Sequence, residues 1–315
     1  IKTTKDKSMM MKTLALSASL LAASFSHANE CETVRFADVG WTDITATTAL
    51  SSVVLESIGY KTKTQVLSVP ITYKSLENKD IDVFLGNWMP TMEADIKPYL
   101  ENGSVESIKK NLEGAKYTLA VPKAVYDAGV KTFADIAKFA DKFDNRIYGI
   151  EPGNDGNRLI QSMIDQDAFG LKGFDVIESS EAGMLSQVKR QTRRNKWIVF
   201  LGWEPHPMNS NFELAYLEGG DDFFGPNLGG ANIHTNVRKN YTAECKNVGQ
   251  FLNNLTFTLE MENEVMAAIL DAGKKPNVAA KEWIKKNPTI LDTWLKDVTT
   301  LDGKPALAAA SAVLK

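Results

Sequence analysis

Short apolar runs alternate with stretches of helical periodicity along the chain. Residues 33–37 read as a strand, and residues 42–58 carry apolar side chains at the spacing of one helix face. A second strand is expected at 64–68, a short helix at 72–78 and a third strand at 80–85. This alternation predicts an α/β fold with a parallel, doubly wound sheet.

The same alternation begins again at residue 114, and the chain ends in a largely helical tail. We therefore expect two doubly wound lobes, with lobe 2 (114–210) inserted between the two parts of lobe 1 (29–113 and 211–315). Because no low-complexity linker separates the lobes, two strands are expected to form the hinge. The further elements are expected as strands at 116–121, 146–150, 175–178 and 197–201, and as helices at 134–139, 157–166, 183–193, 248–270, 279–286, 289–295 and 306–314.

The first residues, 1–28, have the parts of a secretory signal peptide. Four lysines precede an apolar segment at 14–25, and Ser26-His27-Ala28 supplies a small-x-small cleavage pattern. The apolar segment is too short to span a membrane, and no later segment approaches the required length. We expect an exported, periplasmic protein. An exported protein whose chain crosses twice between two α/β lobes has the plan of a periplasmic solute receptor, which closes on its ligand by hinge motion.

Charge excludes some classes of partner. The formal net charge is −3, and loss of the lysine-rich first residues makes the remaining chain more acidic. Such a protein has no electrostatic reason to bind nucleic acid or an anionic membrane. The basic residues at 189–196 read as the solvated end of a helix.

The two cysteines, Cys31 and Cys245, are expected to form a disulfide. A cysteine close behind a signal peptide raises the alternative of a lipid anchor, but Ala28-Asn29-Glu30 is not the small, apolar sequence that precedes a lipidated cysteine. In an oxidising compartment a lone pair of cysteines more simply forms a disulfide. The bond would place the N-terminal strand and the region near residue 245 in one lobe.

A short sequence motif, an apolar strand followed by glycine and tryptophan, occurs at 36–41, 83–88 and 199–203. We expect each glycine to turn the chain as it leaves the sheet and each tryptophan to lie just beyond a strand end. In open α/β sheets ligands bind beyond the carboxyl ends of the strands, so the three tryptophans are expected to converge on one pocket. Indole faces attract quaternary ammonium ions. The alternative is that these tryptophans are ordinary core residues.

Four motifs carry a resemblance to a known family. The segments 38–43, 84–90, 148–157 and 200–207 resemble the choline-binding receptors of bacterial ABC importers, within the glycine-betaine-type substrate-binding proteins. The similarity spans the whole chain after the signal peptide. It implies a monomeric bilobal receptor without cofactor or metal, which encloses a trimethylammonium group in an aromatic box and delivers choline to an ABC permease.

The resemblance also assigns residues. Trp41 and Trp88 would form the box from one lobe, and Tyr117 and Trp203 from the other. Asp43 would lie beside the cationic head, Asn154 would hydrogen-bond the ligand hydroxyl, and the family's disulfide would fall on Cys31 and Cys245. On the residues alone, alternatives remain open: Asp43 as a helix N-cap, Asn154 as a turn residue and Tyr117 as core.

Asp43 suggests how the ligand is selected. Two like charges at about 4 Å repel by roughly 4 kcal/mol at an effective dielectric near 20, which disfavours ligands that bring their own carboxylate. The alternatives are glycine betaine, trimethylamine N-oxide or another quaternary amine as cargo, a sensor domain, and a choline-ester hydrolase. An enzyme is disfavoured because the sequence lacks HExxH, GxSxG and Walker motifs and any metal-ligand spacing of Cys and His.

Overall fold

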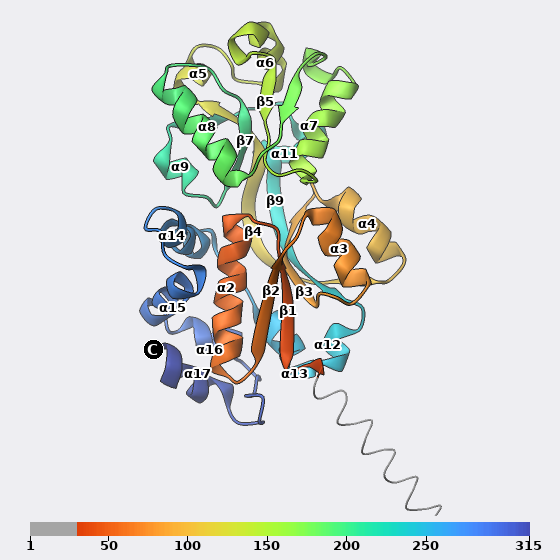
Figure 1. The fold of residues 1–315 in the computed structure, drawn as a ribbon, viewed down its shortest axis with the longest axis vertical. Coiled ribbons are helices and arrows are strands. Elements are labelled where there is room, and N and C mark those ends of the chain that lie inside the picture. The colour runs from red at the N-terminus through yellow and green to blue at the C-terminus, as the bar shows by residue number, and fades with distance from the viewer. Residues whose placement is uncertain (1–29) are drawn as a thin grey trace, which may run out of the picture.

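One mixed sheet runs through the computed structural model, which describes residues 30–315 (Figure 1). Its strands are β1 (Thr33–Asp38), β2 (Lys61–Val66), β3 (Val83–Met89), β4 (Val105–Pro122), β5 (Arg146–Tyr148), β6 (Asp175–Ile177), β7 (Phe200–Glu204), β8 (Leu214–Tyr216) and β9 (Gly230–Arg238). Their order is β2-β1-β3-β9-β4-β7-β5-β6, with β8 paired to β4. The pairs of β1 and of β5 are parallel, as the alternation predicts, whereas those of β4 and β9 are antiparallel. The predicted signal peptide lies outside the described residues.

Helices pack against this sheet and against one another. They are α2 (Thr42–Ser57), α3 (Val69–Glu77), α4 (Glu93–Glu101), α5 (Lys123–Asp127), α6 (Phe133–Ile136), η1 (Ala137–Phe143), α7 (Asp155–Asp165), η2 (Ala168–Gly170), α8 (Glu181–Arg193), α9 (Met208–Asn211), α10 (Asp221–Phe224), α11 (Pro226–Gly229), α12 (Tyr241–Glu244), α13 (Lys246–Asn254), α14 (Leu259–Leu270), α15 (Pro276–Lys286), α16 (Ile290–Trp294) and α17 (Ala306–Leu314). Helix α2 contacts β1, β2 and β3 as well as α14, α15 and α17. Nearly all of its residues are therefore buried.

The elements form two bodies (Figure 1). The first contains β1 to β3, α2 to α4 and the helices from α12 onward, and the second contains β5, β7 and α5 to α9. Strand β4 takes part in both, because its first half pairs with β9 and its second half with β7 and β8. The junction expected at residue 114 thus falls inside a continuous strand. Strand β8 and helix α10 follow the other expected junction, after residue 210, yet they pack against the second body, where the ring centroid of Phe224 lies 5.9 Å from that of Phe133.

The expectation that a glycine ends each of the three strands is right only for Gly40, whose φ is +84°. Strands β3 and β7 continue through Gly86 and Gly202, and both following tryptophans lie inside their strands. These two glycines make room for close packing. A Cβ atom on Gly86 would lie 2.7 Å from the side chain of Ile44, and one on Gly202 would lie 3.0 Å from the Cβ of Ala120.

The tail differs from the prediction of one helix over 248–270. It contains two helices, α13 and α14, with a break between them. Thr258 begins the second helix, because its side-chain oxygen accepts a hydrogen bond from the backbone N–H of Met261 at 3.1 Å. Apolar periodicity continued across this cap and concealed the break.

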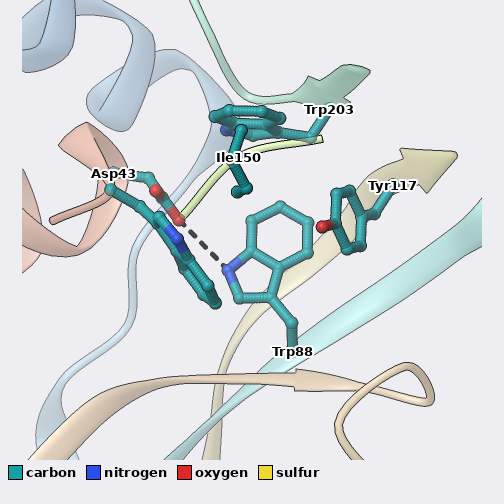
Figure 2. A pocket seen from close by; sticks show the side chains of 6 residues that line it. Asp43, Trp88, Tyr117, Ile150 and Trp203 are labelled. Atoms are coloured by element: carbon teal, nitrogen blue, oxygen red, sulfur yellow. Dashed lines mark hydrogen bonds between the residues drawn. The ribbon is translucent and has the colours of Figure 1, made fainter. Parts of the chain in front are cut away.

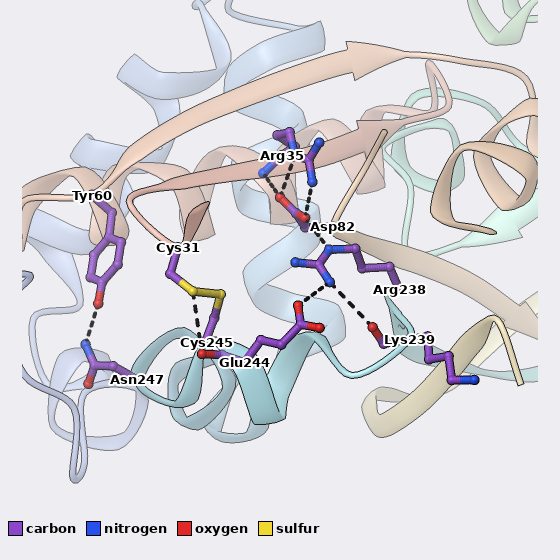
Figure 3. Close-up of a disulfide and its surroundings, with 9 residues drawn as sticks. All are labelled: Cys31, Arg35, Tyr60, Asp82, Arg238, Lys239, Glu244, Cys245 and Asn247. Atoms are coloured by element: carbon purple, nitrogen blue, oxygen red, sulfur yellow. Dashed lines mark hydrogen bonds and ion pairs between the residues drawn. A yellow bond between two sulfur atoms is a disulfide. The ribbon is translucent and has the colours of Figure 1, made fainter. Parts of the chain in front are cut away.

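The predicted disulfide between Cys31 and Cys245 is confirmed (Figure 3). It joins the start of β1 to the junction of α12 and α13 and closes a sequence separation of 214 residues. Nearby, the buried carboxylate of Asp82 accepts hydrogen bonds from Arg35 Nε at 2.9 Å and from Arg238 Nε at 2.8 Å. Covalent and ionic links together fix this end of the first body.

Replacing both cysteines with alanine should lower the free energy of unfolding by about 2–5 kcal/mol, because the unfolded chain regains the freedom that so long a closed loop removes. Urea unfolding of the double variant and of wild type, each with and without reductant, measures the effect. Reduced wild type should match the double variant. Equal unfolding midpoints for oxidised wild type and the double variant would contradict the prediction.

Candidate ligand-binding site

Four aromatic side chains face one small pocket between the two bodies (Figure 2). The empty space between them, with its opening, is about 240 Å³. The lining residues are Trp41, Asp43, Trp88, Tyr117, Ile150 and Trp203. Each of the four rings is at most 5% exposed. The structure therefore brings together five of the six ligand-binding residues expected from the sequence.

Strand register places two of the rings. Tyr117 on β4 is paired directly with Trp203 on β7, so their side chains project from the same face of the sheet. Their ring centroids are 6.3 Å apart at an interplanar angle of 84°. Trp88 on β3 meets the same tyrosine from the other side, with centroids 5.9 Å apart and an angle of 62°. In each of these contacts the edge of one ring packs against the other ring.

Trp41 enters from the start of α2. It occupies the N-cap position of that helix, directly after the turn made at Gly40. Its indole N–H donates to Glu151 Oε1 at 2.6 Å, across the gap between the two bodies. Burial raises the pKa of the Glu151 carboxyl to about 7.

Asp43 is the only acidic residue in the pocket lining within the described part of the chain, and it is 1% exposed. Its Oδ2 accepts a hydrogen bond from the indole N–H of Trp88 at 3.1 Å (Figure 2), whereas its Oδ1 has no hydrogen-bond partner among residues 30–315. Burial, and then the charge of Glu181, raise the pKa of Asp43 to about 8. The N-cap position of α2 belongs to Trp41, so the alternative of Asp43 as N-cap is wrong. A cation in the pocket would supply the counter-charge that this carboxyl lacks.

Asn154 does not line the pocket but lies behind Tyr117. Its Oδ1 accepts from the Tyr117 hydroxyl at 2.9 Å and from the backbone N–H of Asn157 at 3.1 Å, which makes it the N-cap of α7. Its Nδ2 donates to Asp155 Oδ1 at 3.1 Å. Its expected hydrogen bond to a ligand hydroxyl stays a prediction.

Two residues near the pocket were not expected from the sequence. Ile150 contributes an apolar wall, and Glu151 holds Trp41. Both lie in the motif at 148–157, where only Asn154 was singled out. The apolar end of the predicted strand at 146–150 is the available signal for Ile150, because residues at the carboxyl end of a strand lie near the edge where ligands bind, and the observed strand β5 ends two residues earlier, at Tyr148.

Comparison with known proteins identifies the family. The OpuAC model, described as the substrate-binding domain of an ABC-type glycine betaine transport system, matches residues 32–286. The chain belongs to this family. Its relatives are transport substrate-binding proteins.

Solved structures agree with this OpuAC-family assignment. An ABC-transporter choline-binding protein in complex with choline is 61% identical, with a TM-score of 0.90 over 91% of this chain and 99% of that one. A choline-binding protein in an unliganded semi-closed conformation is also 61% identical, with a TM-score of 0.84 over 90% and 99%. Lactococcal OpuAC, closed around glycine betaine, is 27% identical, with a TM-score of 0.75 over 83% and 98%. The predicted periplasmic-binding-protein fold is confirmed.

Within residues 30–315, no helix combines the length and apolar character needed to cross a membrane. Within the same residues, no three His, Cys, Asp or Glu side chains are grouped so that they could hold a metal ion.

The raised pKa of Asp43 predicts a pH dependence of stability. Because the folded-state pKa is about 8 and the unfolded value about 4, the folded state binds more protons between these limits. This group therefore makes the ligand-free protein less stable as pH rises from 4 to 8. Asp43→Asn removes the effect, so the melting temperature of the variant, relative to wild type, should rise with pH. Melting curves of ligand-free protein at several pH values measure it.

The exposed Asp80 provides the matched control. Asp80→Asn should keep a constant offset from wild type over this pH range. If Asp43→Asn also keeps a constant offset, the carboxyl does not titrate as the structure indicates.

Proposed function

We propose that this OpuAC-family protein captures choline outside the cytoplasm and delivers it to the permease of an ABC importer. The observation that carries the proposal is the buried, incompletely paired carboxyl of Asp43 among four aromatic rings. A site of this kind favours a cation without ordinary hydrogen-bond donors. The 61% identical structure that contains choline supports the same ligand.

The size of the interactions favours a box that includes the carboxylate. An aromatic face contributes about 0.5–2 kcal/mol to binding a desolvated cation, so four faces give roughly 2–8 kcal/mol. Micromolar affinity corresponds to about 8 kcal/mol after the costs of association. The rings alone are thus marginal. An ionised Asp43 supplies the remaining attraction, and the cation in turn favours the ionised form.

The two bodies act as the lobes of the receptor in this proposal. The first lobe supplies Trp41, Asp43 and Trp88, and the second supplies Tyr117 and Trp203. The lobes meet at β4 and β9, so a bend of these strands would open the pocket. On the observed pairing, the second lobe continues past residue 210 as far as α11, because β8 and α10 pack against it. Asn154 acts by fixing Tyr117, and the receptor works as a periplasmic monomer.

Glycine betaine is the second candidate ligand. The family model is described by glycine betaine transport, and a 27% identical relative was solved with that ligand. Its trimethylammonium group would fit the same rings. Its carboxylate, however, would add a second acidic group to a pocket in which Asp43 Oδ1 has no hydrogen-bond partner among residues 30–315. This argument favours choline.

Removing a box ring should abolish tight binding. Trp88→Ala and Trp203→Ala should each lower choline affinity at least about tenfold, because each removes a cation–π face and admits water. Calorimetric titration of choline into purified protein measures the affinity. Trp283→Phe, in α15 and outside the pocket, is the control and should bind like wild type. Wild-type affinity in both alanine variants would refute the box.

Asp43→Asn should change the choice of ligand. The amide is close in shape and can still accept from Trp88, but it lacks the charge, so choline affinity should fall. Glycine betaine affinity should fall less or rise, and the ratio of the two affinities should change at least about tenfold. Competition titrations with both ligands on wild type, Asp43→Asn and Asp80→Asn measure it. A wild-type preference for glycine betaine would overturn the proposed ligand.

A further inference from the structure

Glu181 is a buried carboxylate whose role the box does not explain. It is the first residue of α8 in the second body and is 4% exposed. It does not cap its own helix, because the side chain of Ser180 accepts the capping hydrogen bond from the backbone N–H of Gly183. Among residues 30–315, no lysine or arginine forms an ion pair with it. Its oxygens are therefore available to groups beyond its own helix.

Three hydrogen bonds reach this carboxylate, and two of them come from the other body. Thr42, the first residue of α2, donates its backbone N–H to Oε2 at 2.8 Å and its hydroxyl to Oε1 at 2.6 Å. The third is the contact of His206 Nε2 with Oε1 at 3.0 Å. Because His206 Nδ1 accepts from the backbone N–H of Met208 at 2.9 Å, the ring proton lies on Nε2, which donates to Glu181.

The contact between Thr42 and Glu181 also supplies a hydrogen-bond acceptor for the first turn of α2. The first backbone N–H groups of a helix have no partner within it, and the N-cap residue Trp41 provides no side-chain acceptor. Glu181 provides an acceptor from the opposite body, and its negative charge interacts favourably with the positive, N-terminal end of the α2 helix dipole. Separation of the two bodies would leave the Thr42 N–H to water.

The partners of Glu181 are direct neighbours of the box. Thr42 lies between Trp41 and Asp43 in the chain, and the ring of His206 packs edge-on against Trp203, with centroids 4.9 Å apart at 73°. One carboxylate thus connects the Trp41–Asp43 segment of the first body to Trp203 of the second. It does so without lining the pocket itself.

We propose that Glu181 is a positioning residue for ligand capture, which, together with Thr42 and His206, forms a latch that holds the two lobes closed around the bound cation. This inference rests on the proposed function for the identity of the ligand, but not for the existence of the latch. The latch forms when the lobes close and breaks when they open. It therefore acts chiefly on how long a ligand stays bound.

The chemistry of the latch predicts which replacement fails. All three groups that face Glu181 are donors, so a carboxylate satisfies them and an amide does not. Glu181→Gln has one acceptor oxygen, and its NH₂ group must face either Thr42 or His206 as a second donor. Thr42→Val removes one hydroxyl donor from the other side and preserves the shape of the side chain. Glu218→Gln, at an exposed position of the second body, is the matched control.

Stopped-flow tryptophan fluorescence with choline measures the association and dissociation rate constants separately. Glu181→Gln should raise the dissociation rate constant at least about tenfold and change the association rate constant much less. Thr42→Val should raise it to a smaller extent. The double variant should dissociate no faster than Glu181→Gln, because both changes break one latch. If Glu181 were needed only for folding, its replacement would lower the melting temperature without raising the dissociation rate constant more than it changes the association rate constant. Wild-type dissociation in Glu181→Gln, or additive effects in the double variant, would overturn the proposal.

Amide hydrogen exchange of the Thr42 N–H tests the latch without choline. Ligand-free wild type should exchange this amide slowly, and Glu181→Gln should exchange it faster, while Glu218→Gln matches wild type. Equal exchange in wild type and Glu181→Gln would overturn the latch. If wild type binds no choline but shows the protected amide, the proposed function fails and the latch stands.

Discussion

The structure depends on one buried carboxyl, that of Asp43, which forms no ion pair within residues 30–315. Asp43 is held at the start of α2 and is 1% exposed, and its Oδ2 accepts from the Trp88 indole N–H, whereas its Oδ1 has no partner among the described residues. Burying a carboxyl in this way is costly unless a cation pairs with it, and the ligand-free pocket responds by raising its pKa. Glu181 and Glu262, both buried, repel Asp43 and add to the cost. Under the proposed function, a methylated cation offsets this cost of burial and matches the aromatic walls.

The fold buries that carboxyl by bringing elements from two bodies together. Tyr117 and Trp203 are fixed by strand pairing, and Trp88 by the passage of β3 through Gly86 beside Ile44. Because both bodies supply walls of the pocket, their separation would open it, and in the proposed receptor this couples ligand entry to lobe motion.

Membership of the OpuAC family does not by itself fix the ligand. The solved structures that this chain resembles include one with choline and one with glycine betaine, on the same fold. What distinguishes such ligands is charge, because both present a trimethylammonium group to the rings and only one adds a carboxylate. Under the proposed function, we expect selectivity to rest on Asp43 and on the negative groups around it, more than on the aromatic walls.

Much of the molecule followed from the sequence alone. Local periodicity determined the strands up to β7 and most helices, but it placed neither β8 nor β9 and merged α13 with α14. Two cysteines in a chain expected to be exported determined the disulfide, and the motifs with their resemblance determined the five residues that meet in the pocket. These are properties of neighbouring residues or of a known pattern. Only the tertiary structure decided that Gly86 and Gly202 pack rather than turn, that Asn154 supports Tyr117, and that Glu181 reaches Thr42 across 139 residues of chain. Such contacts join segments whose meeting depends on the whole fold, and no local pattern of side chains records them.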